Sequence, residues 1–158
     1  MKTLYAHILW VPCLLIICLA SCEEGKPPSN DGPVFRKAFI DTHDGYSEAV
    51  VIQSGNLKTV YISGQVGAGK DLESQMRSAL SNLEEVLGKA GATMTDVVKM
   101  NTYIVDYGPQ TLASFRKVRK ELLGDSDMPA STLVGVEALA LPEWLIEIEA
   151  VAVVPASE

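Results

Sequence analysis

The sequence predicts one α+β domain, a sheet with two helices on one of its faces. Two segments, residues 71–90 and 111–123, carry apolar residues at three- and four-residue steps, which is the period of an amphipathic helix. Shorter apolar segments bounded by Gly, Pro and Asn alternate with them and predict strands. The order strand, strand, helix, strand, helix, strand, strand is typical of helices packed on one side of a sheet. A chain of 158 residues has room for one such core.

The first half of the predicted sheet begins with a candidate edge strand at residues 34–41. Residues 48–53 and 58–63 then predict two strands, and Ser54-Gly55-Asn56 between them favours a hairpin turn. Asp71 to Ala90 is the clearest helix, and Gly91 offers a C-terminal cap.

The second half of the domain contains a strand, a helix and two further strands. Residues 96–106 predict a long strand with both faces partly apolar, so that one face packs on helices and the other needs a different cover, such as another subunit. Residues 111–123 predict the second helix, which opens near Pro109 and closes at Gly124.

Residues 131–136 and 145–154 complete the sheet. In the last strand one face carries Ile146, Ile148, Ala150, Ala152 and Val154, and the other carries Leu145, Glu147, Glu149, Val151 and Val153. Both faces carry apolar residues and therefore imply two contacts. A carboxylate on such a strand is costly unless it is paired or solvated, which makes Glu149 a candidate functional group.

The first 35 residues have the composition of a targeting segment and a tether. Lys2 precedes an apolar run, residues 8–20, that has the length of a signal-peptide core and is short for a membrane span. Leu19-Ala20-Ser21-Cys22 resembles a lipobox, in which the cysteine is acylated; an ordinary signal or a buried helix that ends in cysteine is the alternative. We expect a signal peptide at 1–21, a lipidated Cys22 with a flexible tether at 22–35, and the folded domain at 36–158.

Composition restricts the chemistry of the domain. The three cysteines of the chain, Cys13, Cys18 and Cys22, fall in the signal or carry the lipid, so disulfides, thiolate catalysis and cysteine metal sites are excluded together. His43 is then the remaining histidine, which excludes a histidine metal cluster and disfavours a Ser-His-Asp triad. No metal or cofactor is expected.

The acidic charge of the chain bears on its partners. The chain has 13 basic and 20 acidic residues, and loss of Lys2 leaves 12 − 20 = −8. Because nucleic-acid affinity comes largely from cationic contacts to phosphate, this charge disfavours a nucleic-acid partner and a ribonuclease role.

Several blocks of the sequence resemble the YjgF/Rid family of imine/enamine deaminases over about Tyr46 to Val154. The blocks are Ile62-Ser63-Gly64-Gln65-Val66, the junction from Ala90-Gly91-Ala92 to Asp96-Val97-Val98-Lys99, Pro129-Ala130-Ser131-Thr132-Leu133-Val134, and Ile146 to Val153. The resemblance implies the chorismate-mutase-like (RidA-like) fold, assembled as a homotrimer. The sheets would form a central barrel, and small-metabolite clefts would lie between subunits. The second apolar face supports that assembly independently, because a monomer would leave it exposed.

The resemblance also implies a set of site residues. Tyr46, Ser63 and Gly64 match ligand-binding positions of the family, and Glu149 matches the glutamate that positions water. Arg116 stands in place of a family asparagine. Ser131 stands in place of the arginine that clamps the substrate carboxylate.

Each of these residues also has a plainer interpretation. Ser63-Gly64 suits any tight turn after a strand, and Tyr46 suits a strand entry. Arg116 lies in a run of basic residues typical of a solvated helix face. The plainer interpretation of Glu149 is a carboxylate paired across a subunit boundary.

The sequence therefore predicts a Rid-family lipoprotein of the bacterial cell envelope, tethered to a membrane, with a deaminase-like cleft. Activity on 2-imino acids is expected to be weak or absent, because serine cannot replace the clamp charge. The usual substrates of such enzymes also arise mainly in the cytoplasm. The alternatives are a deaminase or hydrolase for a differently anchored imine, and a non-catalytic scaffold or interaction module.

Overall fold

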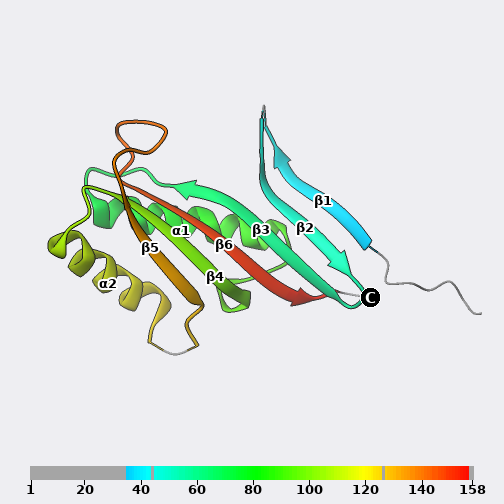
Figure 1. The fold of residues 1–158 in the computed structure, drawn as a ribbon. Helices are drawn as coiled ribbons and strands as arrows, with labels where there is room; N and C mark the ends of the chain where they lie inside the picture. The colour runs from blue at the N-terminus through cyan, green and yellow to red at the C-terminus, as the bar shows by residue number, and fades with distance from the viewer. Residues whose placement is uncertain (1–34, 44, 126, 157–158) are drawn as a thin grey trace, which may run out of the picture. The chain divides into compact units, whose positions relative to one another are not determined.

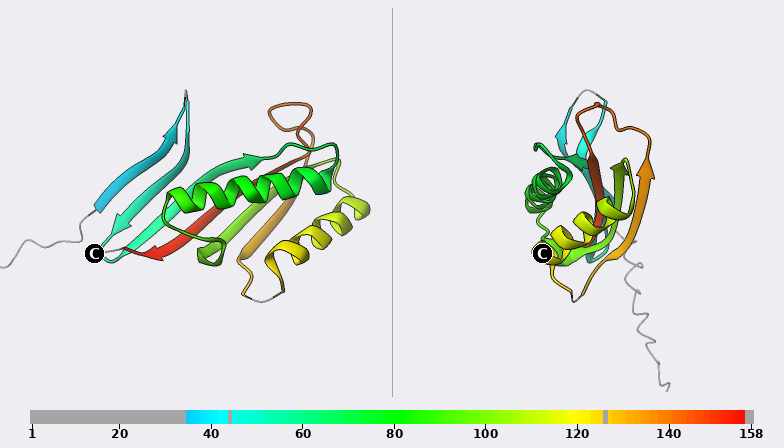
Figure 2. Two further views of the ribbon diagram at one scale, coloured as in Figure 1. Left: turned by 180° about the vertical axis from the view of Figure 1, so that it is seen from behind. Right: turned by 90° about the vertical axis from the view of Figure 1, so that its left-hand side faces the viewer.

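The computed structural model describes residues 35–156 apart from 44 and 126. The predicted signal peptide, the lipidated Cys22 and the tether up to residue 34 lie outside the described residues. Within them, six strands form one sheet with two α-helices on one of its faces (Figures 1 and 2). The predicted α+β architecture is confirmed.

The elements follow the predicted order closely. The strands are β1 (Phe35–Thr42), β2 (Ser47–Ser54), β3 (Leu57–Val66), β4 (Val97–Val105), β5 (Ala130–Val136) and β6 (Ile146–Pro155). The helices are α1 (Leu72–Lys89), the short 3-10 helix η1 (Met94–Asp96) and α2 (Pro109–Leu123). Two bounds differ noticeably from the prediction: α2 begins two residues earlier, with a proline in its first turn, and β3 continues three residues further, to Val66.

The sheet has the order β1-β2-β3-β6-β4-β5. All neighbouring pairs are antiparallel except β4 and β5, which are parallel and are joined through α2. The last strand of the chain therefore lies in the middle of the sheet, between β3 and β4 (Figure 1). The second face of β6 is covered by neither helix.

The β2–β3 hairpin turns at Gly55-Asn56, and Gly55 has a φ of +59°, a conformation that glycine adopts without strain. Further along, the β3–β6 pairing shifts register between Ile62 and Gln65. Ser63-Gly64 is thus an irregularity inside β3 and not the tight turn after a strand that was its plainer interpretation. A strand that bulges uses the same small residues as a turn.

Helix α1 is capped at both ends by the residues that bound its apolar pattern. Asp71 is the N-cap, and its side chain accepts a hydrogen bond from the backbone N–H of Ser74 at 2.8 Å. Gly91, just after the helix, has a φ of +75°. The buried apolar residues of α1 form the stripe that the sequence predicted: Met76, Ala79, Leu80, Leu83, Val86 and Leu87.

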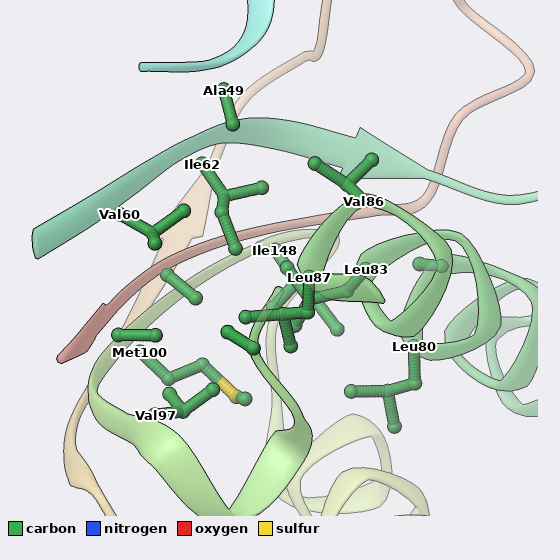
Figure 3. Close-up of a cluster of buried hydrophobic side chains, with 14 of the residues drawn as sticks. Ala49, Val60, Ile62, Leu80, Leu83, Val86, Leu87, Val97, Met100 and Ile148 are labelled. Atoms are coloured by element: carbon green, nitrogen blue, oxygen red, sulfur yellow. The ribbon is translucent and has the colours of Figure 1, made fainter. Parts of the chain in front are cut away.

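The core lies between this stripe and one face of the sheet. Figure 3 shows Leu83 and Leu87 of α1 next to Ile148 of β6, with Val60 and Ile62 of β3 in the same cluster. Residues 146, 148, 150, 152 and 154 of β6 are all buried on this side. We call this face of the sheet the helix side.

The opposite face of the sheet, which we call the open face, is also apolar. The strand registers align Phe39 with Val50, Val50 with Tyr61, and Tyr61 with Val151 in one row across β1, β2, β3 and β6. Phe39 is 62% exposed and Tyr61 is 48% exposed. Exposed rings in a continuous row favour a further contact on the open face.

Candidate functional site

Glu149 lies near the centre of the open face. On β6, residues 147, 149, 151 and 153 alternate with the fully buried positions and are half-buried. The Glu149 carboxylate accepts a hydrogen bond from Asn101 Nδ2 at 2.6 Å and another from the Tyr103 hydroxyl at 3.2 Å, both on Oε1. Two donors from β4 therefore fix one oxygen of this carboxylate as an acceptor and leave the other oxygen free for a further contact.

Glu149 is part of the environment of the Tyr103 hydroxyl. Burial is the largest cause of the raised pKa of Tyr103, and the negative charge and the hydrogen bond of Glu149 raise that pKa further. A raised pKa keeps the phenol protonated as a donor to Glu149. The geometry thus holds the carboxylate in one orientation.

Glu147 is a second carboxyl group on the same face, two residues before Glu149. It pairs with Tyr103 across β4 and with Val66 across β3. Burial raises the pKa of Glu147, and the charge of Glu149 raises it further. Within the part of the chain that the structure describes, no side chain hydrogen-bonds to Glu147.

Gly64 makes room for Glu147. A Cβ atom at residue 64 would lie 1.7 Å from Glu147 Oε1 and 2.7 Å from its Cγ. Any other residue at position 64 would therefore displace the Glu147 side chain. This close approach, and not a turn conformation, is what requires glycine here.

Ser63 and Tyr46 make other contacts. The Ser63 hydroxyl donates to the backbone oxygen of Ser47 at 2.7 Å and ties β3 to the start of β2. The Tyr46 hydroxyl donates to Glu48 Oε1 at 3.3 Å. The charge of Glu48 raises the Tyr46 pKa.

Glu48, near the turn of the β1–β2 hairpin, is the centre of a separate network of side-chain hydrogen bonds. Besides Tyr46, its carboxylate meets His43 Nε2 at 3.0 Å and Gln65 Nε2 at 2.8 Å. Within one protomer the hydroxyl of Tyr46 is therefore engaged with Glu48 and not with Glu149.

Ser131 and Glu149 lie on opposite faces of the sheet. Ser131 pairs with Met100, which is buried on the helix side, whereas Glu149 pairs with Asn101 on the open face. Arg116 is exposed on α2, which covers the helix side (Figure 2). In a single protomer the sheet separates both residues from Glu149.

The structure thus brings together Glu149, Gly64 and three residues that the sequence interpretation did not select: Glu147, Asn101 and Tyr103. Glu147 had a visible signal, because its spacing from Glu149 places both on one strand face. The sequence signal for Asn101 and Tyr103 was weaker: they are two residues apart in β4 and therefore lie on the same face of that strand. Nothing in the sequence pairs them with Glu149, because strand register is a tertiary property.

Other features of the described residues lie apart from this cluster. A groove of about 700 Å³ between α1, η1 and the end of α2 is lined mainly by apolar side chains, among them Met94, Met100 and Leu123, and by none of the predicted site residues. The described residues contain no group of His, Cys, Asp and Glu side chains placed to hold a metal ion. None of the helices in residues 35–156 combines the length and the apolarity needed to cross a membrane.

Comparison with known proteins identifies relatives over this whole domain. Residues 36–154 match the family model described as Endoribonuclease L-PSP. A 2-iminobutanoate/2-iminopropanoate deaminase of Dermatophagoides farinae is 34% identical over 117 residues, which are 69% of this chain and 85% of that protein.

Solved structures give the same result. A member of the YjgF/YER057c/UK114 family from Mycobacterium tuberculosis has a TM-score of 0.65 and 34% identity, and the match covers 75% of this chain and 100% of the other. A Rid-family protein of unknown function from Yersinia pestis has a TM-score of 0.55 and 41% identity, with 75% of this chain and 97% of the other covered.

Proposed function

The chain belongs to the Endoribonuclease L-PSP family, also known as the YjgF/RidA family, and from this premise we propose that it is a deaminase-like protein with a small-molecule site around Glu149. The reaction class is hydrolysis of an imine or enamine to a carbonyl compound and ammonia. The observation that carries the proposal is the Glu149 carboxylate, held by Asn101 and Tyr103 on the open face. An oriented carboxylate of this kind is suited to position a water and to accept its proton.

The other activity in the family's description, endoribonuclease, fits this chain less well. Its formal net charge is −7, and the groups that surround the candidate site include two carboxylates. Polyanionic RNA would be repelled by such a surface. A small imine carries no comparable charge.

We propose weak or absent activity on 2-imino acids. These substrates carry a carboxylate, and an arginine holds a carboxylate by a charge-assisted, bidentate hydrogen bond. In this chain Ser131 occupies the position after Pro129-Ala130 where the family's deaminases carry that arginine. Loss of such a bond costs about 1.5 to 3 kcal/mol, or roughly 10- to 150-fold in affinity. An imine without a carboxylate would escape this loss.

The site is proposed to be complete only between subunits. Ser131 and Arg116 are separated from Glu149 by the sheet of their own protomer, so they reach a Glu149 only if it belongs to a neighbour. The exposed apolar row on the open face supports self-association, and a homotrimer whose sheets form a central barrel is the assembly we propose. Such a trimer would place clefts at its subunit boundaries.

The location proposed for this domain is the bacterial cell envelope, with lipid on Cys22 as the tether. The support is the apolar run and the lipobox-like Leu19-Ala20-Ser21-Cys22. In the host, Cys22→Ser should release the protein from membranes, and labelled fatty acid should enter the wild type. A wild-type protein that takes up no label would refute the anchor.

The catalytic proposal is tested by restoring the clamp. 2-Iminopropanoate is generated in situ by an amino-acid oxidase acting on alanine, and its hydrolysis is followed with the wild type, Ser131→Arg, and Ser131→Arg combined with Glu149→Gln. We expect near-background turnover for the wild type, a gain for Ser131→Arg, and loss of that gain in the double variant, because the clamp and the water-positioning group serve one transition state.

Two results would change this assignment. Robust wild-type turnover that survives Glu149→Gln would contradict the role of Glu149. Wild-type turnover that Arg116→Ala abolishes would show that the substrate anchor had moved to α2.

A further inference from the structure

The groove between α1, η1 and the end of α2 is a cavity on the helix side of the domain, apart from the residues around Glu149. Its volume of about 700 Å³ lies within the roughly 300 to 1,000 Å³ of pockets that bind small molecules. Its most buried lining residues are Leu80 of α1 and Val97 and Met100 of β4, which are 3 to 6% exposed and belong to the hydrophobic core (Figure 3). The groove therefore opens onto the core itself.

Methionine side chains supply much of the apolar lining. Three of the five methionines in the chain, Met94, Met100 and Met128, line the groove. An unbranched, flexible thioether side chain adapts to ligands of different shapes. Leu122 and Leu123 of α2 add further apolar surface, and Leu122 is 47% exposed. Covering these side chains would remove apolar area from water, so the groove suits a ligand with an apolar body.

The charged side chains that line the groove leave an excess of negative charge there. They are Arg77 and Glu84 of α1, and Asp127. Arg77 donates a hydrogen bond to Glu121 of α2, which balances its charge. Within the described residues, neither Glu84 nor Asp127 takes part in an ion pair or a side-chain hydrogen bond. The complement of this unbalanced charge is a cationic group on the ligand.

One face of α1 forms a wall of the groove. Arg77, Ser81 and Glu84 follow one another at steps of four and three residues, which places them on the same side of the helix. Leu80 lines the groove from the same helix and is buried. The Glu84 carboxylate is therefore roughly one helical turn, about 5.4 Å, further along the wall from Leu80. An apolar body against Leu80 would have this carboxylate within reach of a short polar head group.

We propose that the groove binds a small amphiphilic amine, with its apolar body against Leu80, Met94 and Met100 and its protonated amino group at Glu84 and Asp127. An anionic amphiphile such as a fatty acid fits less well, because its head group would meet the same two carboxylates. The site lies on the other side of the sheet from Glu149 and does not depend on the proposed deaminase-like function.

Three fluorescent probes with one apolar body and different head groups test the ligand class on the full-length chain. Dansylcadaverine carries an ammonium group, N-pentyl dansylamide is neutral, and dansyl-aminohexanoate carries a carboxylate. The cationic probe should bind more tightly than the neutral probe by about 2- to 25-fold, because two exposed ion pairs contribute about 1.5- to 5-fold each. The anionic probe should bind most weakly. Fluorescence titration gives the three dissociation constants.

A charge variant on α1 tests the position of the amino group. Glu84→Gln should weaken binding of the cationic probe by about 1.5- to 5-fold and leave binding of the neutral probe unchanged. The matched control is Glu85→Gln, which makes the same change at the next residue of the helix. Glu85 is exposed, pairs with Lys89 and does not line the groove, so this variant should bind both probes as the wild type does.

A filled groove tests the location of the apolar body. Ser81 is exposed on the wall of the groove, and Ser81→Trp would place an indole ring in the space that the ligand needs. Saturable binding of the cationic and neutral probes should be lost. The control is Asn82→Trp, which adds the same ring at an exposed neighbour outside the groove. Probe bound elsewhere on the chain is common to both variants, so their difference measures the groove.

The outcomes support or overturn each part of the inference. Equal binding by Ser81→Trp and Asn82→Trp would overturn the site. Equal affinity of the wild type for the three probes would overturn the amine as the ligand class. If Ser81→Trp does not fold, which circular dichroism shows, the comparison of Glu84→Gln with Glu85→Gln decides. A lower mass by light scattering for Ser81→Trp than for Asn82→Trp would show that a second copy of the chain occupies the groove, and would overturn the small-molecule site.

Discussion

Position within a strand gives Glu147 and Glu149 their different properties. Both lie on the open face, but Glu149 meets the donors of Asn101 and Tyr103, while Glu147 meets only the space left by Gly64. Burial then acts on the carboxyl group that lacks donors and raises its pKa. At this scale the neighbours contributed by β3 and β4 decide the chemistry of each residue.

Replacing Glu147 by an uncharged isostere should change stability in a pH-dependent way. The folded-state pKa of Glu147 is raised above its ordinary value of 4.5, so the folded state binds this proton more tightly than the unfolded chain. The stability contribution of Glu147 is therefore fully present below pH 4.5 and is lost as pH rises through the raised pKa. Glu147→Gln stays neutral at every pH. Relative to the wild type, its free energy of unfolding should therefore increase between pH 4.5 and the raised pKa of Glu147, and the difference between the two proteins should be constant above that pKa.

Urea unfolding at a series of pH values and fixed protein concentration measures this difference. A difference between Glu147→Gln and the wild type that is the same at all pH values would contradict the assignment of the raised pKa to Glu147.

Thr102 offers a second prediction at the residue scale. It is fully buried on the helix side of β4, and within the described residues its hydroxyl oxygen has no hydrogen-bond partner. Thr102→Val keeps the shape and removes the unsatisfied polar group, so it should stabilise the fold by about 1 kcal/mol. Thr102→Ser keeps the hydroxyl, loses a methyl group and should destabilise it. A loss of stability in Thr102→Val would show that the hydroxyl has a partner.

At the scale of elements, the junction of β3 with α1 depends on close backbone approach. A Cβ atom at Gly67 would lie 2.3 Å from the Gln75 backbone oxygen and 2.5 Å from the Ala79 backbone nitrogen. Both contacts are to the backbone of α1, which cannot move aside as a flexible side chain does. Gly67 therefore sets how closely the segment after β3 approaches the helix.

A pair of glycine substitutions measures this contact. Gly67→Ala should destabilise the fold by about 1 to 3 kcal/mol through overpacking. Gly88→Ala, within α1 with no atom within 4 Å of its added Cβ, should stabilise it by about 0.5 to 1 kcal/mol through helix propensity. Thermal unfolding of both variants provides the measurement. Equal effects of the two substitutions would exclude a specific contact at Gly67.

At the scale of the whole molecule, the open face is the feature that one protomer leaves uncovered. Its row of Phe39, Val50, Tyr61 and Val151 crosses four strands. The helix side, in contrast, is covered by α1 and α2 (Figure 2). A second copy of the chain is the partner that we propose for the open face.

Light scattering on the domain without residues 1–23 should give the mass of a trimer. Tyr61→Lys should lower that mass, because it places a charge in the apolar row. Leu122→Lys is the matched control, since Leu122 on α2 is 47% exposed and Tyr61 is 48% exposed. A wild-type protein that is a folded monomer at micromolar concentration would refute the proposed trimer. If Tyr61→Lys and Leu122→Lys lowered the mass equally, the open face would not be the surface through which the subunits associate.

Much of the fold was predictable from local patterns. Asp71 and Gly91 bound a helix because capping acts within a few residues, and the alternation in β6 assigned its two faces because side chains on a strand alternate. The register shift at Ser63-Gly64 was not predictable, because a bulge within a strand is recognised only from its pairing with a partner strand.

The sequence by itself determined the order and type of the elements, the amphipathic faces and the family, all of which depend on residues close together in the chain or on blocks in a fixed order. The tertiary structure alone decided that β6 lies between β3 and β4, and hence that Glu149 meets Asn101 and Tyr103 while Glu147 lies over Gly64. It also placed Ser131 and Arg116 on the other side of the sheet from Glu149. The physical reason is that a local pattern specifies which face a side chain occupies, whereas the neighbours on that face depend on strand order and register, which the packing of the whole chain selects.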